Sequence, residues 1–136
     1  MRMYESPNHL REAMIQRLLK GEKIYFCSNS KEQVKNVEKQ IEKLQRNGLF
    51  KGDVWTVTSD NSGQEETQTK ISEINKTVEN LSFIAASPSL GTGVSIDKGH
   101  PFVSTWGYFN NRSGTVEQAH QQLARARGIT DYNVYV

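Results

Sequence analysis

Short runs of apolar residues alternate along this chain with longer segments whose apolar residues recur every three or four positions. The short runs are residues 23–28 (KIYFCS), 53–58 (DVWTVT), 81–86 (LSFIAA), 102–108 (FVSTWGY) and 132–136 (YNVYV). Such compact runs, containing β-branched or aromatic residues, are typical of strands buried on both faces. Strands separated by helices connect through right-handed crossovers, so this order predicts an α/β fold with a mainly parallel sheet flanked by helices.

The longer segments carry the patterns of amphipathic helices. The first has its apolar positions at Leu10, Met14, Ile15, Leu18 and Leu19, after Ser6 and Pro7 and before Gly21. We predict further helices over residues 31–46, around residues 71–78 and over residues 115–127. Ser28, Asn29 or Ser30 can cap the helix that starts at residue 31.

The length of 136 residues suits a single domain. We expect residues 1–22 to form an N-terminal helix leading into a domain of residues 23–136. One cysteine allows no intrachain disulfide, and three scattered histidines predict no metal site. No run approaches the roughly 20 apolar residues of a membrane helix and no signal peptide is evident, so we expect a cytoplasmic protein with no membrane partner.

The charge of the chain is nearly balanced. With 17 Lys and Arg against 15 Asp and Glu, the net charge is +2, which is too small to identify a polybasic nucleic-acid binder. Any contact with nucleic acid must therefore be local.

Ligands of open parallel sheets bind beyond the carboxyl ends of the strands, which directs attention to the loops after Cys27, Thr58 and Ala86. Gly91, Thr92 and Gly93 lie in the last of these loops, where small residues permit close approach of a ligand or simply form a turn. A dinucleotide fingerprint would need glycine at position 96, where isoleucine stands, and no P-loop pattern occurs in the chain.

The predicted last helix carries a cluster of polar side chains. Gln121 and Arg125 are four residues apart and would share a helix face, with Arg127 close to the end. Two guanidinium groups and an amide could bind one anion. Alternatively, the arginines form a solvated helix end that is favoured by the helix dipole.

Three segments in order, IYFCSNS, ASPSLGTGVSID and EQAHQQLARARGITDYNVYV, resemble motifs IV, V and VI of superfamily 2 helicases. The match is closest to herpesvirus-type origin-binding helicases and related plasmid and viral replication helicases. Motif V corresponds to residues 93–97 (GVSID) and motif VI to residues 121–127 (QQLARAR), with Ala124 where the family has glycine. The P-loop lysine and the acidic box of the first RecA-like domain do not occur, so the resemblance implies a three-layer, second RecA-like domain only.

In such motors ATP lies between two RecA-like domains, and the first domain holds most of the phosphates and Mg²⁺. The resemblance therefore implies a partner domain in the same parent chain and no ATPase activity in this domain alone. It assigns the arginine finger to Arg125 or Arg127, an orienting role to Gln121, and ATP contacts to Gly93, Ser95 and Asp97.

The resemblance also implies contacts with single-stranded nucleic acid, with DNA favoured over RNA and a role in DNA replication. The residues assigned to these contacts are Ser28, Asn29, Ser30, Ser59, Gly91 and Thr92. Short polar side chains and a helix N-terminus can bind phosphates without reading bases, although the same residues also serve as caps and turns. The alternative function is a non-catalytic module for binding nucleic acid or protein that keeps the RecA-like fold.

Overall fold

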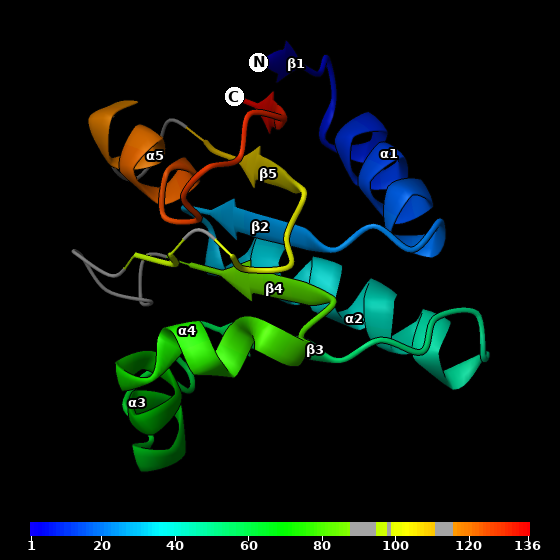
Figure 1. Cartoon of the computed structure of the whole chain (residues 1–136). Coiled ribbons are helices and arrows are strands. Elements are labelled where there is room, and N and C mark those ends of the chain that lie inside the picture. Colours follow the sequence, from blue (N-terminus) through cyan, green and yellow to red (C-terminus); the bar gives the residue numbers. More distant parts are fainter. Residues whose placement is uncertain (88–94, 98, 111–115) are drawn as a thin grey trace.

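A computed structural model of the chain describes residues 1–87, 95–97, 99–110 and 116–136. These residues form a six-stranded sheet in the order β1-β6-β5-β2-β4-β3, in which every pairing is parallel (Figure 1). The strands are β1 (Arg2–Met3), β2 (Ile24–Ser28), β3 (Val54–Val57), β4 (Phe83–Ala86), β5 (Ser104–Tyr108) and β6 (Tyr132–Tyr135). The predicted α/β class is confirmed, and the sheet is parallel throughout the described residues.

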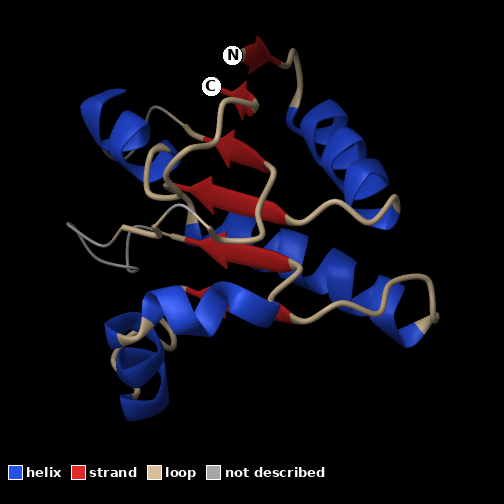
Figure 2. Cartoon of the chain, viewed as in Figure 1, coloured by secondary structure: helices blue, strands red, loops and turns tan. Residues whose placement is uncertain are grey.

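Helices cover both faces of this sheet (Figure 2). The helical elements are α1 (Pro7–Leu19), α2 (Lys31–Arg46), α3 (Glu65–Ser72), α4 (Ile74–Thr77), the 3₁₀ turn η1 (Val78–Asn80) and α5 (Val116–Leu123). One core joins α1 and α2 to Phe26, Phe83 and Trp106, and the other joins α4, η1 and α5 to Tyr25 and Ile84. Because successive strand residues point to opposite faces, each central strand contributes to both cores. Across the described part of the chain, no helix has the length and apolarity that spanning a membrane requires.

The N-terminal helix begins as its sequence predicts. Ser6 accepts a hydrogen bond from the backbone N–H of His9 at 3.1 Å, and Pro7 occupies the first turn. Leu10 and Leu18 are buried, but Leu19 is 43% exposed, so its predicted place in the apolar stripe was wrong. The helical period turns Leu19 about 100° away from Leu18 and therefore off the core.

Two further details depart from the sequence-based expectations. The predicted helix around residues 71–78 is divided into α3, α4 and η1, with a break at Glu73 where the backbone leaves helical geometry (φ −111°, ψ 39°). The strand β1 was not predicted, and its residues Arg2 and Met3 pair with Asn133 and Val134 of β6. A two-residue exposed strand carries no periodicity that a sequence could reveal.

Arg17 ties α1 to the segment that enters β6. Its guanidinium donates to both carboxylate oxygens of Glu22, at 2.9 and 2.7 Å, and to Oδ2 of Asp131 at 2.6 Å. It also lies over the ring of Trp106, 5.3 Å from the ring centroid. The hydrogen bond from Arg17 lowers the pKa of Glu22. Burial would raise the pKa of Asp131, but hydrogen bonds from Arg17 and Asn133 outweigh burial and lower it.

Replacing Arg17 by methionine should lower the free energy of unfolding by about 1–2 kcal/mol, because two part-buried carboxylates lose their charged partner. The pKa values of Glu22 and Asp131 are lowered in the folded state. The stability that these carboxylates contribute is therefore present above their pKa values in the unfolded chain and is lost as the pH falls. The difference between wild type and Arg17→Met should therefore shrink below about pH 4. Urea unfolding at pH 7 and pH 3 measures this stability difference, with Arg46→Met, at an exposed position, as the control. The same stability difference between wild type and Arg17→Met at both pH values would contradict the role of the two carboxylates.

Candidate nucleotide and nucleic-acid site

The carboxyl ends of β2 and β5 are joined by side-chain hydrogen bonds. Asn29 Nδ2 donates to the carbonyl oxygen of Asn110 at 2.8 Å, and the Asn110 N–H donates to Asn29 Oδ1 at 3.0 Å. Ser28 is buried and its Oγ accepts from the N–H of Ser30 at 3.0 Å, whereas Ser30 Oγ accepts from the N–H of Gln33 at 3.4 Å and caps α2. Three predicted nucleic-acid residues thus lie together at the edge where parallel sheets bind ligands, with Ser28 beneath the surface.

A cationic cluster lies between the N-terminal part of α2 and the loop after β3. The carboxylate of Asp60 accepts from Lys31 Nζ at 3.0 Å and also pairs with Lys35. The hydrogen bonds from Lys35 and Lys31 lower the pKa of Asp60. Ser59, the predicted nucleic-acid residue that precedes Asp60, is exposed. The two lysines and Asp60 together carry one net positive charge beside Ser59, and Glu38 of α2 also acts on Lys35.

The segment of residues 95–97 packs against α4 and the end of α5. Asp97 and Asn75 of α4 form two hydrogen bonds: Asn75 Nδ2 donates to Asp97 Oδ2 at 3.0 Å, and the Asp97 N–H donates to Asn75 Oδ1 at 2.8 Å. Ser95 is half-buried and Asp97 is exposed. The other predicted residues of this loop, Gly91, Thr92 and Gly93, lie outside the described residues.

The last helix is shorter than predicted, because α5 ends at Leu123 and not near Arg127. Residues 125–127 leave the helix and form a parallel bridge with Ile96. The Ile96 N–H donates to the Arg125 carbonyl at 2.6 Å, and the Arg127 N–H donates to the Ile96 carbonyl at 2.9 Å. The Arg125 N–H still donates to the Gln122 carbonyl at 3.4 Å, but beyond this point pairing with Ile96 replaces the helix, so Gln121 and Arg125 do not share a helix face as expected.

The bridge gives the two arginines different environments. Arg125 is only 8% exposed and lies near Tyr25 and Cys27. Burial raises the pKa of the Cys27 thiol, and the positive charge of Arg125 acts in the opposite direction. Arg127 is exposed, and its Nη2 donates to Ser95 Oγ at 3.4 Å. The structure therefore brings Ser95 of the predicted motif V next to Arg127 of the predicted motif VI.

Sequence reasoning missed the part played by Gln122. Gln121, which was predicted to act at the site, is exposed, whereas the neighbouring Gln122 is buried. Gln122 Nε2 donates to the carbonyl of Ser28 at 3.3 Å, and the Gln122 carbonyl accepts from the hydroxyl of Tyr25 at 2.9 Å. Gln122 lies three residues after Ala119 and four before Ala126, which is the spacing of residues on one helix face. This apolar spacing could have predicted that Gln122 faces the sheet.

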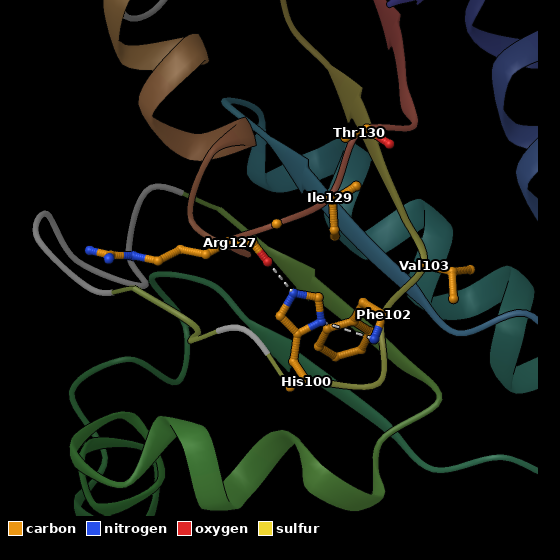
Figure 3. Close-up of a pocket in the computed structure, with 8 residues that line it drawn as sticks. His100, Phe102, Val103, Arg127, Ile129 and Thr130 are labelled. Carbon is orange, nitrogen blue, oxygen red and sulfur yellow. Dashed lines mark hydrogen bonds between the residues drawn. The ribbon is translucent and has the colours of Figure 1, made fainter.

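A cleft of about 500 Å³ opens near Arg127, beside the segments that lead into β5 and β6 (Figure 3). It is lined by Gly99, His100, Phe102, Val103, Arg127, Gly128, Ile129 and Thr130. The side chain of Arg127 points away from His100, while its carbonyl oxygen faces the imidazole ring (Figure 3). The backbone of Arg127 therefore lines the cleft, whereas its guanidinium points away from His100. His100 was not predicted to act at this site.

The described side chains fit one part of a nucleotide site. Within the described part of the chain, the exposed guanidinium of Arg127 makes one long hydrogen bond, to Ser95, which a phosphate oxygen could replace. Asp97 already accepts from Asn75. No group of three or more His, Cys, Asp or Glu side chains that could hold a metal ion occurs among the residues that the structure describes.

No family model matches the chain, and no curated protein matches it. Among solved structures, the chain is similar to the Hef helicase domain of Pyrococcus furiosus, with 15% sequence identity and a TM-score of 0.45 over 95% of this chain. The chain spans 25% of the length of that protein chain. The relation to herpesvirus-type helicases stays a prediction.

The bridge at Ile96 should be visible in solution. We expect the amides of Ile96 and Arg127 to exchange slowly with solvent although both lie outside regular elements, because both donate to backbone carbonyls. Ile96 is 0% exposed, so Ile96→Ala should lower the free energy of unfolding by about 2–4 kcal/mol and accelerate the exchange of the Arg127 amide.

Val103→Ala, at an exposed position of the neighbouring loop, is the matched control and should change the stability by no more than about 0.5 kcal/mol. Native-state hydrogen exchange followed by NMR makes the measurement. Amides of Ile96 and Arg127 that exchange as fast as those of an unfolded peptide would rule out the bridge.

Proposed function

We propose that this chain is the second RecA-like domain of a nucleic-acid-dependent ATPase of the superfamily 2 helicase type, acting in DNA replication. The observation that carries the proposal is the pairing of residues 95–97 with residues 125–127. These segments were separately likened to motifs V and VI, which in such motors face the nucleotide together. Their pairing in this fold, with one arginine exposed beside Ser95, supports the resemblance by geometry that the motif patterns do not contain.

In this proposal Arg127 is the arginine finger and Arg125 supports it. A finger must reach a phosphate held by another domain, which suits the exposed Arg127 and not the buried Arg125. A planar guanidinium can donate two parallel hydrogen bonds to phosphate oxygens and stabilise the charge that develops on them during transfer. Gln121, exposed on the last turn of α5, would help to orient the attacking water or the arginine.

ATP and Mg²⁺ are held mainly by a first RecA-like domain of the same parent protein. This chain adds Arg127 and the neighbouring Ser95 and Asp97, and also Gly93, which lies outside the described residues. By itself the chain does not hydrolyse ATP in this proposal, because its sequence contains no P-loop pattern.

The nucleic-acid path in this proposal follows the carboxyl ends of β2 and β3. The N-terminus of α2, with Asn29 and Ser30, offers polar groups to a phosphate, and the cluster of Lys31, Lys35 and Asp60 adds net positive charge. Ser59 lies beside this cluster, and Gly91 and Thr92, which the proposal also assigns to this path, lie outside the described residues. Contacts of this kind bind the backbone of a single strand without reading its bases.

Single-stranded DNA should bind weakly and independently of sequence at this edge. Lys35→Gln should weaken binding and reduce the slope of log affinity against log salt by about 0.7, the value for one lost phosphate contact on a single strand. Asp60→Asn should strengthen binding, because the carboxylate competes with phosphate for both lysines. Fluorescence anisotropy of a labelled oligonucleotide over a salt series measures both effects.

Lys39→Gln is the matched control, since Lys39 is an exposed lysine one turn further along α2 and away from Asp60. It removes the same charge and should leave the salt slope unchanged. Equal effects of Lys35→Gln and Lys39→Gln, or NMR shifts confined to the amino ends of the strands, would exclude this path.

The two arginines should respond differently to substitution by lysine. In the protein that joins this domain to a P-loop domain, Arg127→Lys should reduce DNA-stimulated ATP turnover by about 10³-fold or more, because lysine lacks the planar fork. The melting temperature of Arg127→Lys should stay within about 2 °C of wild type, since the side chain is exposed. Arg125→Lys should instead lower the melting temperature, because its side chain is buried.

Steady-state ATPase assays and thermal melts of the purified variants give both readouts. Wild-type turnover in Arg127→Lys and Arg125→Lys would overturn the finger assignment. That result would favour the non-catalytic nucleic-acid or protein-binding module instead.

A further inference from the structure

Both ring nitrogens of His100 are engaged, and their partners define its protonation. Nδ1 lies 3.1 Å from the N–H of Phe102, which can only donate, so Nδ1 is the acceptor. Nε2 lies 2.8 Å from the carbonyl oxygen of Arg127, which can only accept, so Nε2 carries the proton. These partners match the Nε2–H tautomer of His100, whose orientation is fixed by Phe102 and whose donor is directed at Arg127 (Figure 3).

The backbone of Arg127 is held on both sides. Its N–H donates to the carbonyl of Ile96 at 2.9 Å, and its carbonyl accepts from His100 Nε2. The next residue is Gly128, whose φ of +85° turns the chain away toward β6. Two partners thus fix the peptide groups on either side of the Arg127 Cα atom, and this fixes the direction in which its side chain leaves the backbone.

His100 is itself anchored to the segment that pairs with Arg127. The His100 N–H donates to the carbonyl of Asp97 at 3.3 Å, and Asp97 is bound to Asn75 of α4. The His100 ring also packs against the buried ring of Phe102, with 5.5 Å between ring centroids. The imidazole therefore connects two fixed parts of the fold to the carbonyl of Arg127.

We propose that His100 is a positioning residue for Arg127, holding its carbonyl through Nε2–H so that the guanidinium projects at a constant angle. The inference rests on the proposed function, in which Arg127 acts on a phosphate. Rate enhancement by an oriented group is sensitive to its placement, and a displacement of about 1 Å can cost about 10²-fold in rate. The hydrogen bond from His100 to the Arg127 carbonyl can prevent such a displacement, and it leaves the guanidinium available to a phosphate.

Two amide substitutions separate the two ring nitrogens. In His100→Gln, the side-chain amide nitrogen can reach the position of Nε2 and donate to Arg127, but the acceptor at Nδ1 is lost. In His100→Asn, the amide oxygen can replace Nδ1 as the acceptor for Phe102, but no donor reaches Arg127. Each variant loses one of the two hydrogen bonds of His100. Comparing the two variants therefore separates the effect of the bond to Arg127 from a general loss of stability that both variants share.

The first readout uses this chain alone and no ATPase activity. We expect the NMR order parameter of the Arg127 Nε–Hε group to fall in His100→Asn and to stay near the wild-type value in His100→Gln. The second readout is turnover in the protein that also carries a P-loop domain. We expect His100→Asn to lower kcat about tenfold or more with little change in KM for ATP, and His100→Gln to stay within about threefold of wild type.

Equal effects of the two variants on the order parameter, or no effect of either, would overturn the positioning role. A selective loss of order in His100→Asn would support it even if Arg127→Lys left turnover intact, in which case the proposed function fails and the structural role of His100 stands. A kcat that is unaffected in His100→Asn while Arg127→Lys abolishes turnover would leave the function and reject His100 as a positioning residue.

Discussion

The candidate site depends on one short backbone pairing between residues 96 and 126. Two hydrogen bonds, of 2.6 and 2.9 Å, join segments that lie about thirty positions apart in the sequence. Both Ile96 and Ala126 are fully buried in the core beneath the sheet, so apolar packing keeps water from competing for these hydrogen bonds. This pairing holds Ser95 next to Arg127, and His100, which binds the carbonyls of both Asp97 and Arg127, joins the same two segments.

The same pairing decides the environments of the arginines. A continuous helix would place residues 125 and 127 about 200° apart around its axis and would leave no backbone groups at these positions to pair with Ile96. Beside Ile96 the chain instead leaves the helix, with Arg125 buried near Tyr25 and Arg127, two residues further on, exposed. The bridged Ala126 thus stands between a buried arginine and an exposed arginine that is available to a ligand.

Local patterns predicted the regular elements, and non-local contacts account for what they missed. Residues 31–46 match α2 because a cap at Ser30 and the buried stripe of Val34, Val37 and Ile41 are local signals. The early end of α5 arises from pairing with Ile96, and the role of His100 depends on a loop fold that places its ring against Arg127. No sequence window contains both partners of either contact. The grouping of Asn29, Ser30 and Ser59 near one edge was foreseen, because parallel strands place their carboxyl ends together.

In the proposed function, Arg127 completes a nucleotide site whose other half lies on a P-loop domain. A crystal structure of the protein that contains both domains, with ADP and a fluoride mimic of the transferred phosphoryl group, tests this most directly. We expect the Arg127 guanidinium within hydrogen-bonding distance of the mimic, no more than about 3.2 Å, with the Ile96 pairing and the His100 contact retained. A mimic contacted by Arg125 or by no residue of this chain, with Arg127 facing solvent in the closed state, would contradict the account.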